Sequence, residues 1–144
     1  FGLPDTPETG WKVDLQNPFG EGILGTLRVS AGAVCTSGNY ARFQTIQGHR
    51  YSHIVDPRSA RPAEAVPSAT VLAPTAMEAD IWATALCVLG PDGMKHLPES
   101  VEAVLVLGNA ANHEIICTKG MLPHMDANLR QKTKVSDFQP QPIY

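Results

Sequence analysis

The sequence predicts an α+β fold, with a mainly antiparallel sheet packed against one principal helix. Short runs that alternate apolar and polar residues recur along the chain and are separated by turn residues, which is typical of antiparallel strands. Only residues 75–89 carry both the start and the stop signals of a helix. With 144 residues, 43% of them hydrophobic, the chain has the size and composition of one globular domain with its own core.

Five strand-like runs come first, each bounded by Gly, Pro, Asn or Ser. They are residues 11–15, 23–30, 32–36, 40–46 and 50–55. We expect Ser37-Gly38-Asn39 to break the chain between the third and fourth runs, and Gln47-Gly48 to form the corner of a hairpin. Residues 58–68 contain two prolines and no periodicity, so they are predicted to be a loop.

The helix follows a short predicted strand over residues 69–73. Thr75 and Glu78 form a T-x-x-E capping box, in which each side chain satisfies a free backbone N–H of the first turn. Gly90-Pro91 should end the helix near Leu89.

The remaining elements are predicted to be a short helical turn and a hairpin. The helical turn falls within residues 91–99, and the hairpin joins residues 101–107 to residues 114–118. The last segment, residues 126–144, is polar and contains two prolines, so we predict an extended tail.

Charge and cysteine content exclude several classes of protein. A net charge of −3 offers no basic surface for nucleic acid or anionic lipid. The apolar runs are too short to cross a bilayer, so no membrane-spanning segment is expected. Cys35, Cys87 and Cys117 are widely spaced within apolar runs, which favours buried thiols over a zinc site or a disulfide framework.

Asp80 and Thr84 are the strongest candidates for metal ligands. Their i,i+4 spacing places both on one face of the predicted helix. A carboxylate and a hydroxyl are part of an Mg²⁺ site, which water and substrate phosphate then complete. No Lys or Arg lies within four residues of Asp80. The alternative is that Asp80 is simply solvated and Thr84 packs.

Four further residues could contact a reacting group or a cofactor. His53, expected in the strand over residues 50–55, could act as a general base, or be a core histidine. Arg58 could bind phosphate through its guanidinium, or belong to an ordinary Asp-Pro-Arg turn. Ser37 and Gly38 are small enough for a ligand to approach the backbone, or could form a tight turn.

Four segments of the chain form a pattern in their order and spacing: Thr36-Ser37-Gly38-Asn39-Tyr40, Tyr51 to Arg58, Thr70 to Pro74, and Ala79-Asp80 with Thr84-Ala85-Leu86. This pattern closely resembles the C-terminal half of the ApbE family of FAD:protein FMN transferases. Glu114 to Met121 is similar to the closing strand of that family. The resemblance implies that residues 1–125 form the C-terminal portion of an ApbE (T-fold-like) domain.

The resemblance also implies an activity. Enzymes of this family transfer FMN from FAD to a Ser or Thr hydroxyl of a partner flavoprotein, in a Mg²⁺-dependent reaction that releases AMP. They are therefore transferases of a phosphorus-containing group. Family metal ligands correspond to Asp80 and Thr84, and the active-site histidine corresponds to His53. Many family members are exported lipoproteins, which implies a periplasmic or membrane-anchored location.

Two departures from the family pattern affect this interpretation. Ser59-Ala60 stands where the family typically has Thr-Gly, and alanine lacks the access of glycine to positive φ. Family members are also longer, and the half that holds most flavin contacts has no counterpart here. We therefore expect an incomplete active site, in a fragment, a cleavage product or one subunit of a split enzyme, with a second polypeptide supplying the N-terminal half. The alternatives are a non-catalytic FAD-binding or carrier module, and a structural subunit that completes another chain.

Overall fold

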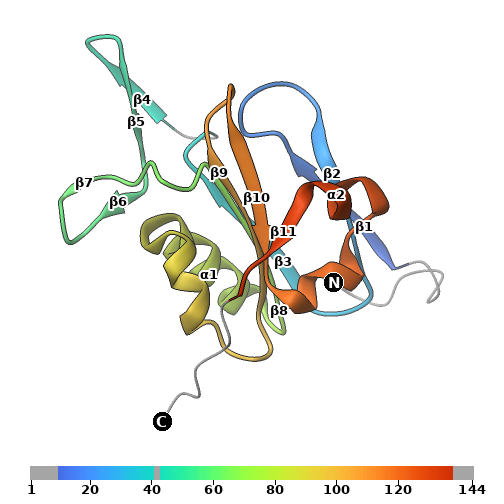
Figure 1. Ribbon diagram of the computed structural model, residues 1–144. Coiled ribbons are helices and arrows are strands. Elements are labelled where there is room, and N and C mark those ends of the chain that lie inside the picture. Colours follow the sequence, from blue (N-terminus) through green and yellow to red (C-terminus); the bar gives the residue numbers. More distant parts are fainter. Residues whose placement is uncertain (1–9, 41–42, 138–144) are drawn as a thin grey trace.

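A five-stranded sheet lies at the centre of the fold, with helical or β-hairpin layers on both faces (Figure 1). The structure is a computed structural model that describes residues 10–40 and 43–137. Neighbouring strands are antiparallel, except that β11 runs parallel to β10. In spatial order the strands are β11 (Thr133–Val135), β10 (His113–Cys117), β9 (Glu102–Gly108), β8 (Ser68–Ala73) and β3 (Ala33–Gly38). The predicted α+β class is confirmed.

Helix α1 (Ala76–Leu89) covers one face of this sheet. The predicted capping box is present, because Thr75 Oγ1 accepts a hydrogen bond from the Glu78 N–H at 3.2 Å and Glu78 Oε2 accepts one from the Thr75 N–H at 3.2 Å. The helix ends at Gly90 and the 3₁₀ helix η1 (Pro91–His96) follows. Small and branched side chains fill this layer: Ala69, Val71, Ala79, Ala83, Leu86, Ala103 and Leu105.

The opposite face of the sheet is covered by a β-hairpin and two short helical elements. The hairpin pairs β1 (Trp11–Gln16) with β2 (Ile23–Val29). The helical elements are the 3₁₀ helix η2 (Lys119–His124) and helix α2 (Ala127–Lys132). Buried apolar residues of this layer include Leu15, Leu27, Val29, Val104, Ile115, Cys117, Met121 and Leu129. No helix in the described part of the chain is long and apolar enough to cross a membrane.

Two small hairpins project from the sheet on the same side of the molecule as α1 (Figure 1). The first pairs β4 (Phe43–Ile46) with β5 (His49–Ser52), and the second pairs β6 (Val55–Asp56) with β7 (Arg61–Pro62). Gln47 and Gly48 connect the first hairpin with φ values of 51° and 80°. Positive φ at both positions is typical of the two-residue turn that we predicted there.

Two predicted boundaries in this region are wrong. β3 continues through Ser37 and Gly38 because both pair with β8, whereas we predicted a break. The strand predicted over residues 50–55 is interrupted after Ser52, and His53 lies in a bend. The bend forms because Ser52 Oγ accepts a hydrogen bond from the Ile54 N–H at 3.1 Å, which competes with strand pairing.

The segment from residue 126 onward, predicted to be extended, begins instead with α2 and β11. Asp126 caps α2 by accepting a hydrogen bond from the Leu129 N–H at 2.7 Å, and it accepts another from the Thr26 N–H of β2 at 2.8 Å. Leu129 is fully buried, and its Cβ would lie 2.5 Å from a Cβ placed on Gly25. Only glycine at that position lets α2 lie this close to β2. Residues 138–144 of the predicted tail lie outside the described residues.

Candidate functional site

The clearest cluster of predicted site residues lies where α1 packs beside β3. Ser37 Oγ of β3 lies 3.0 Å from Thr84 Oγ1 of α1, close enough for a hydrogen bond between the two hydroxyls. Asp80 lies one helical turn before Thr84 and is exposed. Side chains alternate along a strand, so Cys35 shares the face of Ser37 that meets the helix. The structure therefore brings Ser37 of β3 to Thr84, and Asp80 lies one turn before Thr84 on the same face of α1.

Asp80 has no positively charged partner among the described residues. Among the residues that the structure describes, no ion pair or hydrogen bond to the Asp80 carboxylate is present. Asp80 acts on the thiol of Cys35, whose pKa is raised first by burial and then by the negative charge of Asp80. The Cys35 thiol donates a weak hydrogen bond to the Ala76 carbonyl oxygen at 3.7 Å. Asp80 thus has no ion-pair partner within the described part of the chain, and it lies on a helix whose only other charged residue is Glu78.

The donor set fits a hard cation and does not fit zinc. Across the described residues, no three His, Cys, Asp or Glu side chains gather as metal ligands. The cluster offers one carboxylate and the hydroxyls of Thr84 and Ser37, which are oxygen donors of the kind Mg²⁺ accepts. Asp80 and Thr84 are both exposed, so water and phosphate oxygens can complete a coordination shell. The cluster could supply part of an Mg²⁺ site.

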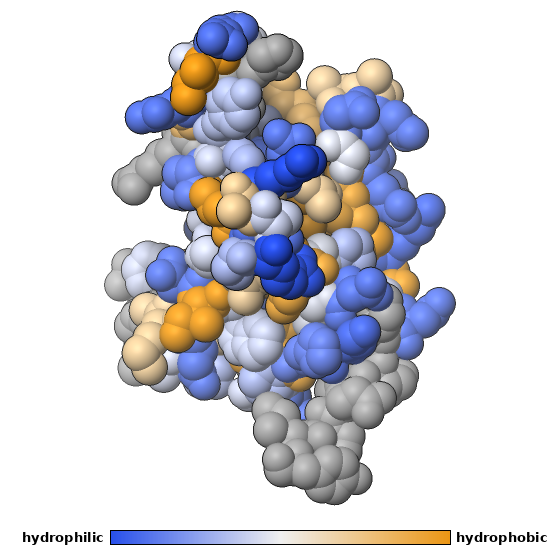
Figure 2. Space-filling model, turned by 90° about the vertical axis from the view of Figure 1, so that its left-hand side faces the viewer, coloured by the Kyte–Doolittle hydropathy of each residue, from blue (hydrophilic) through white to orange (hydrophobic). Residues whose placement is uncertain are grey.

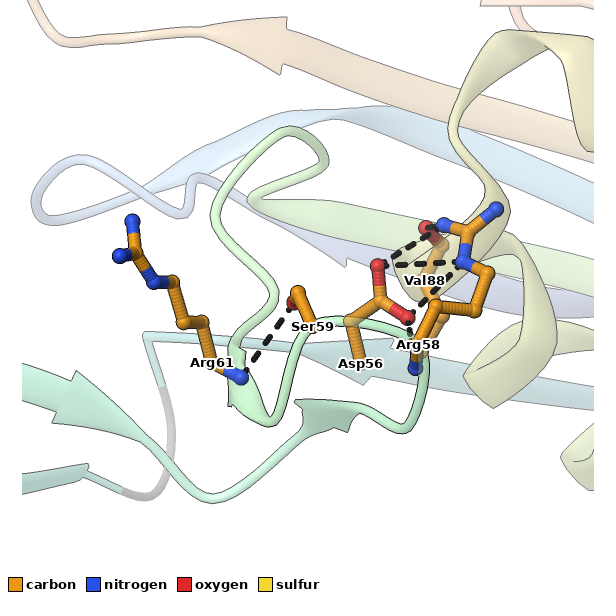
Figure 3. Close-up of polar contacts among 5 residues, drawn as sticks. All are labelled: Asp56, Arg58, Ser59, Arg61 and Val88. Carbon is orange, nitrogen blue, oxygen red and sulfur yellow. Dashed lines mark hydrogen bonds and ion pairs between the residues drawn. The ribbon is translucent and has the colours of Figure 1, made fainter.

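Arg58 lies elsewhere and is already paired (Figure 3). Its Nε lies 2.9 Å from Asp56 Oδ1, its Nη2 lies 2.9 Å from Asp56 Oδ2, and Nη2 also donates to the Val88 carbonyl oxygen at 3.2 Å. These bonds lower the pKa of the Asp56 carboxyl. Val88 follows Asp80 by about 12 Å along the helix axis. Arg58 therefore stabilises the C-terminal end of α1, and its contact with a phosphate stays a prediction.

Asp56 also organises the turn before β7, as the ordinary interpretation of Asp-Pro-Arg expects. Its Oδ1 accepts a hydrogen bond from the Arg58 N–H at 2.9 Å, and its carbonyl oxygen accepts one from the Ala60 N–H at 2.8 Å. Ser59 Oγ accepts a bond from the Arg61 N–H at 3.3 Å, while the Arg61 guanidinium points away from Asp56 (Figure 3). Ala60 adopts a φ of 54°, so the turn has the conformation that a glycine would favour there.

His53 is exposed and lines an open pocket of about 420 Å³ on the hairpin β4–β5. Its neighbour Ile54 is buried in the core beneath α1, and the Ile54 carbonyl oxygen accepts a hydrogen bond from the Ala63 N–H at 2.9 Å. The burial of Ile54 and this hydrogen bond therefore hold the backbone next to His53 in place. No hydrogen bond or ion pair among the described residues joins His53 to the Asp80 carboxylate. Its catalytic role stays a prediction.

Gly38 has a packing reason to lack a side chain. A Cβ on Gly38 would lie 2.6 Å from the Pro67 carbonyl oxygen and 2.6 Å from the Tyr40 ring. Just beyond this glycine, a second open pocket of about 420 Å³ begins. It shares Phe43 and Ser52 with the pocket of His53. The two pockets are therefore neighbours, but neither Ser37 nor Gly38 lines them, and the cofactor contacts of these two residues stay a prediction.

The sequence did not single out Cys35 as part of the site. It was grouped with the two buried thiols, whereas it is only partly buried and lies beside Asp80. Cys87 and Cys117 are buried as predicted, and burial raises the pKa of Cys87 to about 12 and that of Cys117 to about 11. Because side chains alternate along a strand, a strand over residues 33–37 places Cys35 on the same face as Ser37.

Known proteins resemble this chain in sequence. The ApbE family model matches residues 1–106. The FAD:protein FMN transferase of Rhodobacter capsulatus is 36% identical over 126 residues, covering 87% of this chain and 24% of that protein. The FAD:protein FMN transferase of Escherichia coli K12 is 39% identical over 90 residues, covering 60% of this chain and 26% of that protein. The chain thus spans about a quarter of the length of these curated relatives.

Solved structures agree with the sequence matches. The ApbE protein of Thermotoga maritima superposes with a TM-score of 0.62 and 34% identity, over 69% of this chain and 34% of that chain. The flavin transferase ApbE of Vibrio cholerae superposes with a TM-score of 0.65 and 26% identity, over 80% of this chain and 38% of that chain. The fold, the sequence matches and the predicted motifs agree. The chain therefore belongs to the ApbE family.

Proposed function

We propose that this chain supplies the cation-binding side of an FAD:protein FMN transferase. The observation that carries the proposal is the cluster of Asp80, Thr84 and Ser37: the exposed Asp80 lies one helical turn before Thr84, and the Thr84 hydroxyl lies 3.0 Å from that of Ser37. Relatives that bear the name FAD:protein FMN transferase support FAD as the substrate and a flavoprotein as the acceptor. The same names support a transferase activity for the enzyme that contains this chain.

Asp80 and Thr84 would hold Mg²⁺, with Ser37 positioning the Thr84 hydroxyl. Such a cation, when bound, neutralises negative charge that develops on the pyrophosphate. The exposed position of Asp80 leaves room for phosphate oxygens beside the carboxylate. Ser37 restricts the rotation of the Thr84 side chain, because the two hydroxyls share a hydrogen bond.

His53 would take the proton of the acceptor hydroxyl. The reaction forms a bond between that oxygen and the phosphorus of FMN, and it breaks the pyrophosphate bond so that AMP leaves. A neutral imidazole nitrogen has a lone pair that can accept such a proton. The exposure of His53 in an open pocket leaves it accessible to a second polypeptide. Its backbone is fixed by the burial of Ile54, which suits a residue that must be positioned.

The test uses the complete enzyme that contains this chain, with FMN transfer and Mn²⁺ binding measured in parallel. Asp80→Asn should abolish transfer and weaken Mn²⁺ binding, measured by electron paramagnetic resonance, by at least about tenfold. Asp92→Asn is the matched control, because Asp92 is also an exposed carboxylate and lies outside the cluster. It should change neither quantity.

A second variant, His53→Ala, tests the proposed general base separately from the proposed cation site. This variant should lower transfer by about 10²-fold or more, the usual contribution of a general base, while leaving Mn²⁺ binding unchanged. Wild-type transfer and wild-type Mn²⁺ affinity in Asp80→Asn would refute the cation assignment. Undiminished transfer in His53→Ala would refute only the base.

A further inference from the structure

A pocket of about 420 Å³ lies beside the hairpin β4–β5 and contains none of the residues assigned to the cation site. Three aromatic side chains from separate parts of the chain line it, and we call it the aromatic pocket. Phe19 lies between β1 and β2, Tyr40 follows β3, and Phe43 begins β4. Because aromatic rings present large apolar surfaces, they provide walls against which a ligand can bury apolar atoms.

One face of the hairpin β4–β5 forms a wall of the aromatic pocket. Phe43 pairs with Ser52, cross-strand partners share a face, and both residues line the pocket. Ile46 lies an odd number of residues from Phe43 on the same strand, so it belongs to the other face. The two side chains are similarly exposed, at 45% for Phe43 and 53% for Ile46. Figure 2 shows hydrophobic residues (orange) among hydrophilic ones (blue) at the level of this hairpin.

The aromatic pocket adjoins the pocket of His53. Phe43 and Ser52 line both pockets, and His53 directly follows Ser52 in the chain. Ser52 Oγ accepts a hydrogen bond from the Ile54 N–H at 3.1 Å, and Ile54 is buried in the core. The border between the two pockets is therefore held by the fold. A polypeptide that brings a hydroxyl to His53 has a path past this border into the aromatic pocket.

The charge of the aromatic pocket favours a basic side chain. Among the described residues that line it, Glu64 alone is charged. Glu64 is exposed and, within the described part of the chain, forms no ion pair. A Lys or Arg side chain of a ligand would pair with this carboxylate while its aliphatic stem and its cation contact the aromatic rings.

We propose that the aromatic pocket binds the acceptor polypeptide beside the Ser or Thr that receives FMN, and that it selects a Lys or Arg near that residue. This inference rests on the proposed function, in which His53 takes the proton of the acceptor hydroxyl, and adds the place and the preferred sequence of the acceptor. An extended chain advances about 3.3 Å per residue, so a basic residue in the neighbouring pocket lies within about four residues of the hydroxyl. FAD is a poorer occupant, because Glu64 would repel its pyrophosphate.

The test uses the complete enzyme that contains this chain and an acceptor protein that has not yet received FMN. The KM for the acceptor and the KM for FAD are measured separately. Phe43→Ser should raise the KM for the acceptor by about tenfold, because aromatic side chains often contribute most of the binding energy at an interface. Glu64→Lys should raise it by about tenfold or more, because it places like charges opposite each other.

Each variant has a matched control. Ile46→Ser removes a similarly exposed apolar side chain from the other face of the same hairpin. Glu99→Lys reverses the charge of another exposed carboxylate, which does not line the aromatic pocket. Neither control should change the KM for the acceptor. None of the four variants should change the KM for FAD or the binding of Mn²⁺, which also shows that each variant is folded.

A second measurement tests the preferred sequence of the acceptor. Residues of the acceptor protein within four positions of its Ser or Thr are changed one at a time to Lys or to Glu. At one or more of these positions the wild-type enzyme should favour Lys over Glu by about tenfold in kcat/KM. Glu64→Lys should reverse this preference at the same position, an effect that general damage to the fold does not produce.

Three results would overturn the proposal. The first is a KM for the acceptor that stays at the wild-type value in both Phe43→Ser and Glu64→Lys. The second is an equal rise of the KM for FAD, because the pocket would then hold the flavin. The third is an equal effect of the control Ile46→Ser.

These results are distinct from a failure of the proposed function. If Asp80→Asn retained transfer and metal affinity while Glu64→Lys still reversed the sequence preference, only the cation assignment would fail. If the acceptor KM were insensitive to Phe43 and Glu64 while Asp80→Asn abolished transfer, the aromatic pocket would be wrong and the cation site would stand.

Discussion

Ala60 adopts a left-handed backbone conformation, with a φ of 54°, in the turn after Asp56. The Asp56 carbonyl oxygen holds this turn by accepting hydrogen bonds from the Ser59 N–H at 3.2 Å and the Ala60 N–H at 2.8 Å. The left-handed conformation costs an L-residue with a Cβ about 1–2 kcal/mol, and glycine avoids this cost. Ala60 thus adopts a conformation that would be less strained for glycine, the residue that the family typically has there.

We predict that Ala60→Gly stabilises the protein by about 0.5–1 kcal/mol, which is the relief of strain less the entropy that glycine adds to the unfolded chain. Urea unfolding measures the change. Ala65→Gly is the control, because Ala65 is exposed and has no positive φ, and it should be neutral or destabilising. A loss of stability in Ala60→Gly would show that the turn carries no strain.

At the candidate site, relations between residues close in sequence were predictable, and contacts between distant segments were not. The i,i+4 relation of Asp80 and Thr84 is local, so helix geometry was enough to place both on one face. The contact of Ser37 with Thr84 spans 47 residues and depends on β3 lying beside α1, which no local pattern encodes. Arg58 was a candidate for phosphate, but the sequence could not reveal that its guanidinium also reaches the Val88 carbonyl oxygen.

Among the elements, α1 was predictable and α2 was not. Thr75, Glu78 and Gly90 mark the ends of α1 by chemistry that is local in sequence. Helix α2 has only six residues, too few for a periodic pattern, and its one local signal is the cap residue Asp126. Strand β11 exists because it pairs in parallel with β10, a contact between distant segments. The polar composition after residue 126 therefore suggested a tail.

Asp126 joins α2 to β2, and its loss should destabilise both. The carboxylate accepts hydrogen bonds from the Leu129 N–H at 2.7 Å and the Thr26 N–H at 2.8 Å. We predict that Asp126→Ala lowers the free energy of unfolding by about 1–2 kcal/mol at neutral pH. Glu99→Ala, at an exposed carboxylate in a turn, is the control and should change it by less than about 0.5 kcal/mol.

The effect of Asp126 should depend on pH in a defined direction. Its hydrogen bond from the Leu129 N–H lowers the pKa of the carboxyl below the ordinary value of 3.8. A lowered pKa means that the stabilisation is present above that ordinary value and is lost as the pH falls through the folded-state pKa. The difference between wild type and Asp126→Ala should therefore shrink below pH 3.8. A difference that stays constant down to acid unfolding would contradict the capping role.

For the whole molecule, the class of fold was predictable because antiparallel strands alternate visibly and their hairpins are local. We predicted a hairpin from residues 101–107 and 114–118, and β9 and β10 pair as expected. The order of the sheet was not predictable, since β3 and β8 are separated by the two projecting hairpins. The convergence of Phe19, Tyr40 and Phe43 on one pocket was equally hidden, because it joins separate segments of the chain.

The whole chain should bind FAD poorly when it is alone. The two pockets beside the hairpin β4–β5 are open, with volumes of about 420 Å³ each, and open pockets bury little of a ligand as large as a dinucleotide. We predict that a titration followed by flavin fluorescence shows no saturable binding of FAD in the micromolar range. Full-length Escherichia coli FAD:protein FMN transferase, titrated in parallel, is the positive control. Micromolar affinity of the isolated chain would instead favour a flavin-carrier module, because these 144 residues would then hold the flavin without a partner.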